Sequence, residues 1–163
     1  MKKTIVLIRH AHRDNALRVR DNGLSDKGLE QARWLKKYFC KRFEKPSAVW
    51  LVSSPKKRCI ETLEPIAAEG GWKIDAHPDL HGQALGESQP KFEARPPRFL
   101  NEWKASPQEL TVVCSHGDWL PDAVQYLLGA SVDFKKGAWL ELDWEGAALL
   151  KGFIPSFKPF YDT

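Results

Sequence analysis

The chain has 163 residues, of which 42% are hydrophobic and 28% are charged, a composition typical of one soluble globular domain. This length excludes a large barrel enzyme and a multidomain receptor, and the apolar runs are too short to span a membrane. Lys and Arg number 25 against 21 Asp and Glu, so the net charge is +4. Because the basic residues are scattered, they fit a cationic pocket for an anionic substrate and do not indicate a nucleic-acid surface.

The N-terminal part of the chain alternates predicted strands and helices. A continuous β-branched and apolar run at residues 4–8 predicts a strand buried on both faces, and residues 48–52 predict a second one. Between them, a polar loop over residues 9–24 leads to Ser25, which we expect to cap a helix running to about residue 43. We expect the apolar face of this helix to consist of Leu29, Ala32, Leu35, Phe39 and Phe43.

The middle of the chain is the hardest to interpret. Pro55 predicts the first turn of a second helix, and Pro65 is expected to kink or end it before the glycines at 70 and 71. Residues 72–76 indicate a third strand. Residues 77–98 lack clear periodicity and are predicted to be mostly loop, with a short helix at about 99–104; we expect residues 77–106 to form a lid.

The C-terminal part has clearer signals. Residues 110–114 predict another buried strand, followed by a helix over 117–128 that ends at Gly129. Two late strands, over 138–144 and 147–153, are expected to be joined by a turn. Alternating strands and helices predict an α/β fold: one domain over residues 1–163, with a mostly parallel sheet in a three-layer α/β/α sandwich.

Cysteine usage and the N-terminus indicate a cytoplasmic protein. Cys40, Cys59 and Cys114 are few, far apart and odd in number, which favours reduced thiols over a disulfide framework. The start, Met-Lys-Lys, has the charge of a signal peptide, but the apolar stretch behind it is too short to be one.

Unusual polar residues follow three of the predicted strands. Arg9 and His10 end the first, Ser53 and Ser54 end the second with Arg58 soon after, and His116 ends the strand at 110–114. Ligands of parallel α/β sheets bind at the carboxyl ends of the strands, so these residues can converge on one pocket. Arginine suits phosphate oxygens, and a neutral histidine can attack phosphorus. Together they indicate phosphoryl transfer through a covalent phosphohistidine.

The same residues lie in motifs that resemble those of the histidine phosphatase superfamily, the phosphoglycerate-mutase-like fold. Residues 9–11 are similar to its R-H-G/A signature, and residues 24–32 to its L-[ST]-x-x-G-x-x-Q-A segment. Residues 53–62 resemble S-S-P-x-x-R-x-x-x-T, and residues 115–117 the second-histidine motif. Four motifs in the family's order are a far more specific signal than R-H-A alone.

The resemblance implies a role for each matching residue. His10 corresponds to the nucleophile, Arg9 and Arg58 to the phosphate-binding arginines, and His116 to the second pocket histidine. Arg13 stands where the acid phosphatases and phytases of the family have another arginine, which implies phosphate contact. The resemblance implies no cofactor and no metal.

One expected group is missing. Many members carry a glutamate general acid in an L-x-E segment after the third strand, where this chain has Leu80, His81 and Gly82. Short bacterial phosphohistidine phosphatases are similar in this respect. Imidazole leaves easily because its conjugate acid has a pKa of about 6.5, whereas an alkoxide needs protonation. The sequence therefore favours phosphohistidine, unless Glu87, His81 or Asp118 donates the proton; the alternative role for Asp118 is to cap the following helix.

Several alternatives stay open. A small-molecule phosphomonoesterase of the same superfamily, or a phosphate-binding module without turnover, fits the same motifs. A cysteine-nucleophile phosphatase is disfavoured because no Cys has an Arg six residues later. The pair His10 and His12 could bind a metal, although Arg9 and Arg13 would repel a cation. The expected partner is a phosphorylated small molecule or a phosphohistidine-bearing protein, with no nucleic acid or membrane; the sequence does not predict an oligomeric state.

Overall fold

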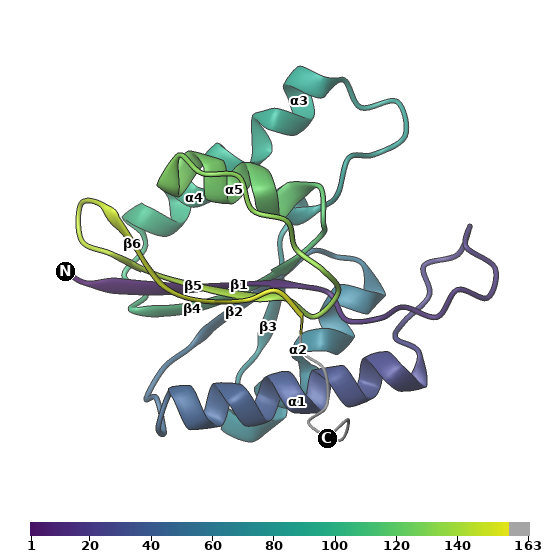
Figure 1. Cartoon of the computed structure of the whole chain (residues 1–163), viewed down its shortest axis with the longest axis horizontal. Coiled ribbons are helices and arrows are strands. Elements are labelled where there is room, and N and C mark those ends of the chain that lie inside the picture. The colour runs from purple at the N-terminus through teal and green to yellow at the C-terminus, as the bar shows by residue number, and fades with distance from the viewer. Residues whose placement is uncertain (157–163) are drawn as a thin grey trace.

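The computed structural model describes residues 1–156 and confirms the predicted α/β architecture (Figure 1). Six strands form one sheet in the order β3-β2-β4-β1-β5-β6. The strands are β1 (Lys3–Arg9), β2 (Trp50–Ser53), β3 (Ile74–Ala76), β4 (Leu110–Ser115), β5 (Trp139–Trp144) and β6 (Ala148–Ile154). Neighbours among the first four pair in parallel, and β5 runs antiparallel to both β1 and β6. The sheet is therefore mostly parallel, as predicted.

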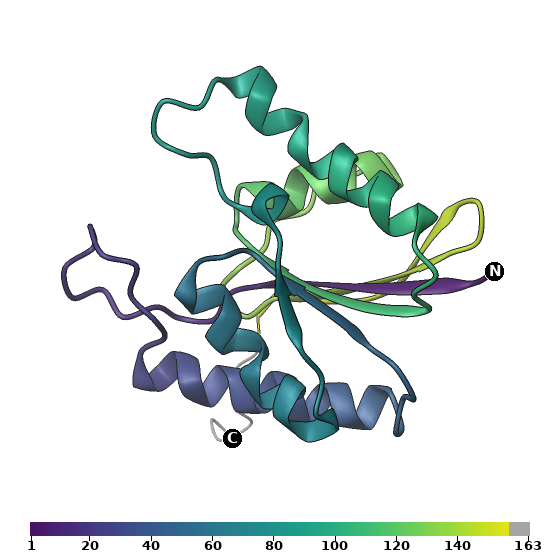
Figure 2. The same cartoon turned by 180° about the vertical axis from the view of Figure 1, so that it is seen from behind.

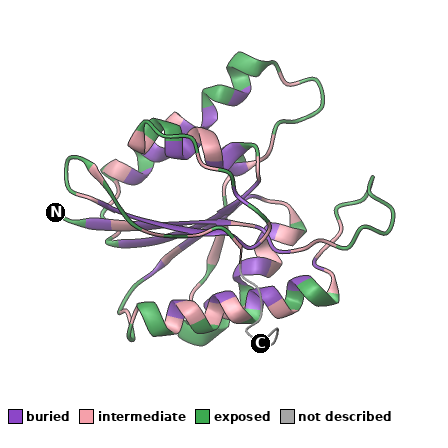
Figure 3. Ribbon diagram, in the orientation of Figure 1, coloured by how far each residue is buried: buried purple, intermediate pink, exposed green. Residues whose placement is uncertain are grey.

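Helices cover both faces of the sheet, which gives the three layers (Figures 1 and 2). The helices α1 (Asp26–Arg42) and α2 (Lys57–Gly70) lie on one face. The other face carries the 3₁₀ turn η1 (Pro78–Leu80) and the helices α3 (Gln89–Glu93), α4 (Arg95–Ala105) and α5 (Trp119–Leu128). The helix sides that face the sheet are buried and the outer sides are exposed (Figure 3).

The central strands divide their side chains between two cores, because successive residues of a strand point to opposite faces. Ile5 and Leu7 of β1 pack with the α4 and α5 side chains, whereas Val6 and Ile8 pack with those of α1 and α2. All four are fully buried, as expected for a strand covered on both faces.

The helix α1 follows the prediction at its start and departs from it on one face. Ser25 is the N-cap, and its hydroxyl accepts a hydrogen bond from the Gly28 amide (3.1 Å). Leu29, predicted to be in the core, is 41% exposed, and the polar Gln31 is buried instead. The prediction was wrong there because Gln31 has a polar partner: its side-chain oxygen accepts from the His12 amide (2.8 Å).

Two segments that contain proline are more helical than predicted. The helix α2 continues through Pro65 to Gly70, because the buried face formed by Cys59, Leu63 and Ile66 packs along the sheet and offsets the lost hydrogen bond. In the stretch 77–98, predicted to be mostly loop, the structure has η1, α3 and the start of α4. Pro96 lies in the first turn of α4. Backbone amides in the first turn of a helix have no intrahelical partner, so a proline costs no hydrogen bond there and favours the start of the helix.

No helix within residues 1–156 combines the length and the apolar character that a membrane crossing requires.

Candidate active site

The three predicted strand ends converge on one pocket. In the sheet, β4 lies between β2 and β1, so their carboxyl ends are neighbours. A cavity of about 520 Å³ opens there, lined by Arg9, His10, Arg58 and His116 together with residues of the surrounding loops. An adjoining cavity of about 480 Å³ shares Arg58 and His116 with it. The loops before α1 and before α3 extend from this same end of the molecule (Figure 1).

His10 is held as a neutral nucleophile. Its Nδ1 lies 2.8 Å from the Ala11 carbonyl oxygen, which can only accept, so Nδ1 carries the ring proton and Nε2 keeps a free lone pair. Burial, followed by the charges of His116, Arg58 and Arg9, lowers the pKa of His10 to about 3, against the opposing effect of the Ala11 hydrogen bond. At neutral pH the ring is therefore unprotonated at the nitrogen that lies among the arginines.

Arg58 connects the two histidines. It lies in the first turn of α2, with Nε 3.3 Å from His10 Nε2 and Nη2 3.3 Å from His116 Nδ1. Thr62, one turn further on, fixes this arrangement. Its hydroxyl donates to the Arg58 carbonyl oxygen (2.7 Å) and accepts from the Ala11 amide (3.0 Å), which ties α2 to the end of β1.

Only part of the Arg9 guanidinium is hydrogen-bonded. Its Nη1 donates to the Phe134 carbonyl oxygen (2.6 Å), while its Nε is buried with no hydrogen-bond partner among residues 1–156. A Cβ on Gly117 would lie 2.8 Å from Arg9 Cζ, so only glycine lets the guanidinium lie against this loop. Arg9 lines the cavity, and its positive charge there suits an anionic ligand.

His116 is positioned by Ser54, one of the polar residues predicted at the strand ends, for which no specific role was predicted. Ser54 Oγ lies 2.8 Å from His116 Nε2, and the rings of His116 and His10 meet edge to face with centroids 5.4 Å apart. Because a guanidinium only donates, Arg58 requires His116 Nδ1 to accept, which leaves the Nε2 proton for Ser54. The signal for Ser54 was its place directly after β2, beside β4.

Of the three candidate proton donors, Glu87 is paired with Arg95. Its carboxylate accepts two hydrogen bonds from Arg95, each 2.9 Å long, and these lower the pKa of Glu87. The buried Arg95 guanidinium also donates to the carbonyl oxygens of Asp79, His81 and Gly82, so it holds the whole loop between η1 and α3. Arg95 is a residue that the sequence did not single out.

His81 and Asp118 both line the site. Burial and the charge of His116 lower the pKa of His81, so its ring is neutral at pH 7. Asp118 does not cap α5, because its side chain makes no capping hydrogen bond. Its Oδ2 accepts from the Gln83 amide (2.9 Å) instead, and a Cβ on Gly82 would lie 3.1 Å from Asp118 Oδ1. The Asp118 carboxylate thus lies beside the position where the family resemblance predicts a glutamate.

The outer residues of the pocket are Arg13 and Lys136, of which only Arg13 was predicted. Both line the 520 Å³ cavity. His12, in contrast, does not line it; its Nδ1 lies 2.7 Å from Ser25 Oγ at the start of α1. Within residues 1–156, no three His, Cys, Asp or Glu side chains are grouped so that they could hold a metal ion.

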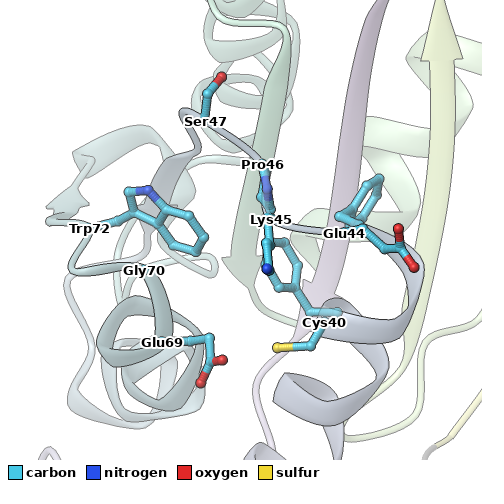
Figure 4. A pocket seen from close by; sticks show the side chains of 10 residues that line it. Cys40, Glu44, Lys45, Pro46, Ser47, Glu69, Gly70 and Trp72 are labelled. Carbon is cyan, nitrogen blue, oxygen red and sulfur yellow. The ribbon is translucent and has the colours of Figure 1, made fainter.

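A larger cavity, of about 680 Å³, lies elsewhere on the molecule (Figure 4). It is enclosed by the last turns of α1 and α2 and by Trp72, with Phe39, Cys40 and Glu69 among its lining residues. No histidine or arginine lines it. The chemistry predicted from the sequence therefore belongs to the pocket at the strand ends.

Comparison with known proteins gives the family of the chain. The family model described as histidine phosphatase superfamily (branch 1) matches residues 5–89. No curated protein sequence matched the chain.

Solved structures with the same fold include three phosphatases or proposed phosphatases. An Escherichia coli protein proposed to be an alpha-ribazole-5'-P phosphatase aligns with a TM-score of 0.80 at 16% identity, covering 96% of this chain and 100% of that one. A mycobacterial glucosyl-3-phosphoglycerate phosphatase in complex with VO3 gives 0.75 at 19% identity, covering 92% and 98%. A phosphoserine phosphatase from Entamoeba histolytica gives 0.73 at 16% identity, covering 93% and 96%.

Proposed function

Since this chain belongs to branch 1 of the histidine phosphatase superfamily, we propose that it is a phosphatase that works through a phosphohistidine on His10. The observation that carries this proposal is the His10 ring, which is buried, neutral and held with Nε2 among Arg9, Arg58 and His116. In the first step Nε2 attacks phosphorus, and the bond from phosphorus to the leaving group breaks with its electron pair. In the second step water attacks phosphorus, the P–N bond breaks, and inorganic phosphate leaves.

The cations stabilise the transferred group. The guanidinium groups of Arg9 and Arg58 both line the cavity and can donate to phosphoryl oxygens, and His116 lies beside Arg58. Charge on these oxygens changes as the phosphoryl group moves, so donors that are already fixed in place favour the transition state over the bound substrate.

We assign the proton for the leaving group to Asp118. Glu87 is held as a carboxylate by Arg95, and neutral His81 has little tendency to give up its ring proton. Asp118 is exposed at the mouth of the cavity, beside Gly82, where its carboxylate can exchange protons with solvent.

Two substrate classes fit this site. Gly82 in place of a glutamate supports a protein phosphohistidine, whose imidazole leaves without much help. The Asp118 carboxylate, and the structural similarity to phosphatases of phosphoserine and of a sugar phosphoglycerate, support a small phosphomonoester. The dependence of turnover on the leaving group separates the two.

The decisive experiment is to trap the intermediate. The protein is mixed with 4-nitrophenyl phosphate or with a phosphohistidine protein, quenched in base, digested and analysed by mass spectrometry. We expect a base-stable, acid-labile phosphate on His10, and none on a His10→Asn variant. Hydrolysis by that variant at the wild-type rate would refute the mechanism. Binding of phosphate without turnover of any substrate would mean that the chain is a phosphate-binding module.

A further inference from the structure

Lys136 is a cation without a partner. It is half-buried, lies in the loop before β5 and lines the same cavity as His10. Its side chain makes no hydrogen bond or ion pair with any residue in the described range 1–156. A lysine ammonium in such a position normally pairs with a carboxylate or reaches into water. Here burial and the charges of Arg9 and Arg13 lower its pKa.

Arg13 has donors free on the same side of the cavity. Its Nε is buried without a hydrogen-bond partner among the described residues. Its Nη2 makes only long contacts with the carbonyl oxygens of Arg18 (3.3 Å) and Arg20 (3.5 Å). Because Arg13 lines the cavity and these two contacts are long, its guanidinium can exchange them for an anionic ligand.

The backbone holds both cations at the end of β1. Arg13 forms an isolated antiparallel bridge with Leu24. The residue after Lys136 is Gly137, whose amide lies 3.1 Å from the Arg9 carbonyl oxygen and 3.2 Å from that of His10. Each cation is thus attached close to the nucleophile by main-chain hydrogen bonds.

The cavity has more cationic side chains than the two charges of one phosphoryl dianion require. Arg9 and Arg58 already match the two charges of a phosphoryl dianion, with His116 beside them. Of the acidic groups near the cations, Asp118 lines the cavity, while Asp133 acts on Arg9 and Asp21 acts on Arg58 from outside its lining. Arg13 and Lys136 remain, and their mutual repulsion would be relieved by a second anion.

We propose that Arg13 and Lys136 form a second anion subsite, so that the preferred substrate is a small phosphomonoester whose leaving group carries a carboxylate or a second phosphate. This inference rests on the proposed phosphatase function. A phosphohistidine on a protein has no anionic group in its leaving imidazole, so the subsite would give it no advantage.

A matched pair of esters tests the subsite. The esters 3-carboxyphenyl phosphate and 3-carbamoylphenyl phosphate have nearly the same shape and differ by one charge. We expect the wild type to prefer the carboxylate in kcat/KM by roughly tenfold to a hundredfold, the range of one hydrogen bond to a charged group. A third ester, 3-phosphonophenyl phosphate, shows whether a phosphate-like dianion is preferred over the carboxylate.

Variants assign the preference to the two residues. Lys136→Met and Arg13→Gln should each bring the carboxylate-to-carbamoyl ratio close to one, whatever their absolute rates. Lys135→Met removes the same charge from an exposed neighbour outside the cavity and should keep the ratio. Direct binding of 3-hydroxybenzoate, compared with that of 3-hydroxybenzamide, should follow the same pattern and requires no turnover.

The outcomes separate this inference from the phosphatase proposal. If both esters are hydrolysed through His10 with equal kcat/KM in the wild type, the subsite is refuted and the phosphatase function stands. If the ratio is unchanged in both variants, the preference belongs to other residues and the assignment is wrong. If neither ester is hydrolysed and no phosphate appears on His10 with any substrate, both proposals fail.

Discussion

His10 and His116 are 5% and 6% exposed, whereas residues 83–86, on the opposite wall of the same pocket, are all exposed. The wall that carries the two histidines, here called the strand-end wall, is built from the ends of β1, β2 and β4. Its side chains are fixed by Ala11, Ser54 and Thr62. The opposite wall is a loop held by side chains from other segments, chiefly Arg95, with Asp118 bonded to the Gln83 amide. Buried strand ends keep reacting groups in place, while loops can vary without disturbing the core.

This contrast suggests that the two walls have different roles in catalysis. The strand-end wall should set the rate of phosphoryl transfer, and the loop wall, with Arg13 and Lys136, should choose the leaving group. Variants on the first wall should then affect all substrates alike, whereas variants on the second should change the ranking of substrates.

The largest expected effect is the loss of the nucleophile. His10→Ala should lower kcat for 4-nitrophenyl phosphate by on the order of a thousandfold or more, because no other group can take the phosphoryl group. His12→Ala is the matched control. Its ring lies against Ser25 and not in the cavity, so kcat should stay within a few-fold of wild type. If the two variants lose activity equally, the strand-end wall does not contain the nucleophile.

The next largest effect concerns the other three pocket residues of the strand-end wall. Arg9→Ala, Arg58→Ala and His116→Ala should each lower kcat by about a hundredfold or more for every substrate, with smaller changes in KM. Changes confined to KM would mean that these groups only collect substrate.

A glycine substitution tests the same wall without removing a charge. Gly117→Ala should also lower kcat, because its Cβ would lie 2.8 Å from Arg9 Cζ and push the guanidinium away. Gly152→Ala is a suitable control, since a Cβ there meets nothing within 4 Å. Wild-type kcat in Gly117→Ala would show that the position of Arg9 is not critical.

The strand-end wall was predictable from the sequence, and the reason is local. Buried strands are recognisable as apolar runs, and parallel strands bring their carboxyl ends together whatever the rest of the chain does. Arg9, His10 and His116 directly follow such runs, and Arg58 begins the next helix. The sequence therefore placed them in one pocket correctly.

The loop wall was not predictable, because its contacts join distant and irregular segments. Arg95 donates to the carbonyl oxygen of Asp79, 16 residues earlier in the chain. Lys136 lines the same cavity as Arg13, whose charge acts on it, although the two are far apart in sequence. No periodicity marks these residues. The prolines before Phe99 read as helix breakers, although they start α4 and so place Arg95 under the loop. Asp118 looked like a helix cap until the structure showed its carboxylate beside Gly82.

A variant of the loop wall should change the ranking of substrates. Asp118→Asn should lower turnover of alkyl phosphates by about a hundredfold and leave 4-nitrophenyl phosphate nearly unaffected, because only a poor leaving group needs the proton. The measurement is kcat/KM across phosphate esters of graded leaving-group pKa. The slope should be shallow in the wild type and steep in Asp118→Asn.

Two further variants serve as controls for this slope. Glu87→Gln and His81→Ala alter the loop between η1 and α3, which Asp118 contacts, and should keep the wild-type slope, since neither residue is assigned the proton. A steep wild-type slope that none of the three variants changes would mean that the protein has no general acid. That result would favour protein phosphohistidine as the substrate.

The smallest expected effect is on stability, and it comes from the depressed pKa of His10. Folded His10 takes up a proton only near pH 3, whereas the unfolded chain takes one up near pH 6.5. Between these values the unfolded state binds more protons, so falling pH destabilises the folded state. From pH 7 to pH 5 this amounts to about 2 kcal/mol, at about 1.4 kcal/mol for each pH unit below 6.5.

Denaturant unfolding of the wild type and His10→Gln at both pH values measures this contribution. The wild type should lose about 2 kcal/mol more than the variant between pH 7 and pH 5, because all other titrating groups are common to the two proteins and largely cancel. Equal losses would mean that folded His10 titrates like an exposed histidine. Its neutral ring would then not be a consequence of burial, and the strand-end wall would be less rigidly closed to water than its contacts with Ala11 and Arg58 imply.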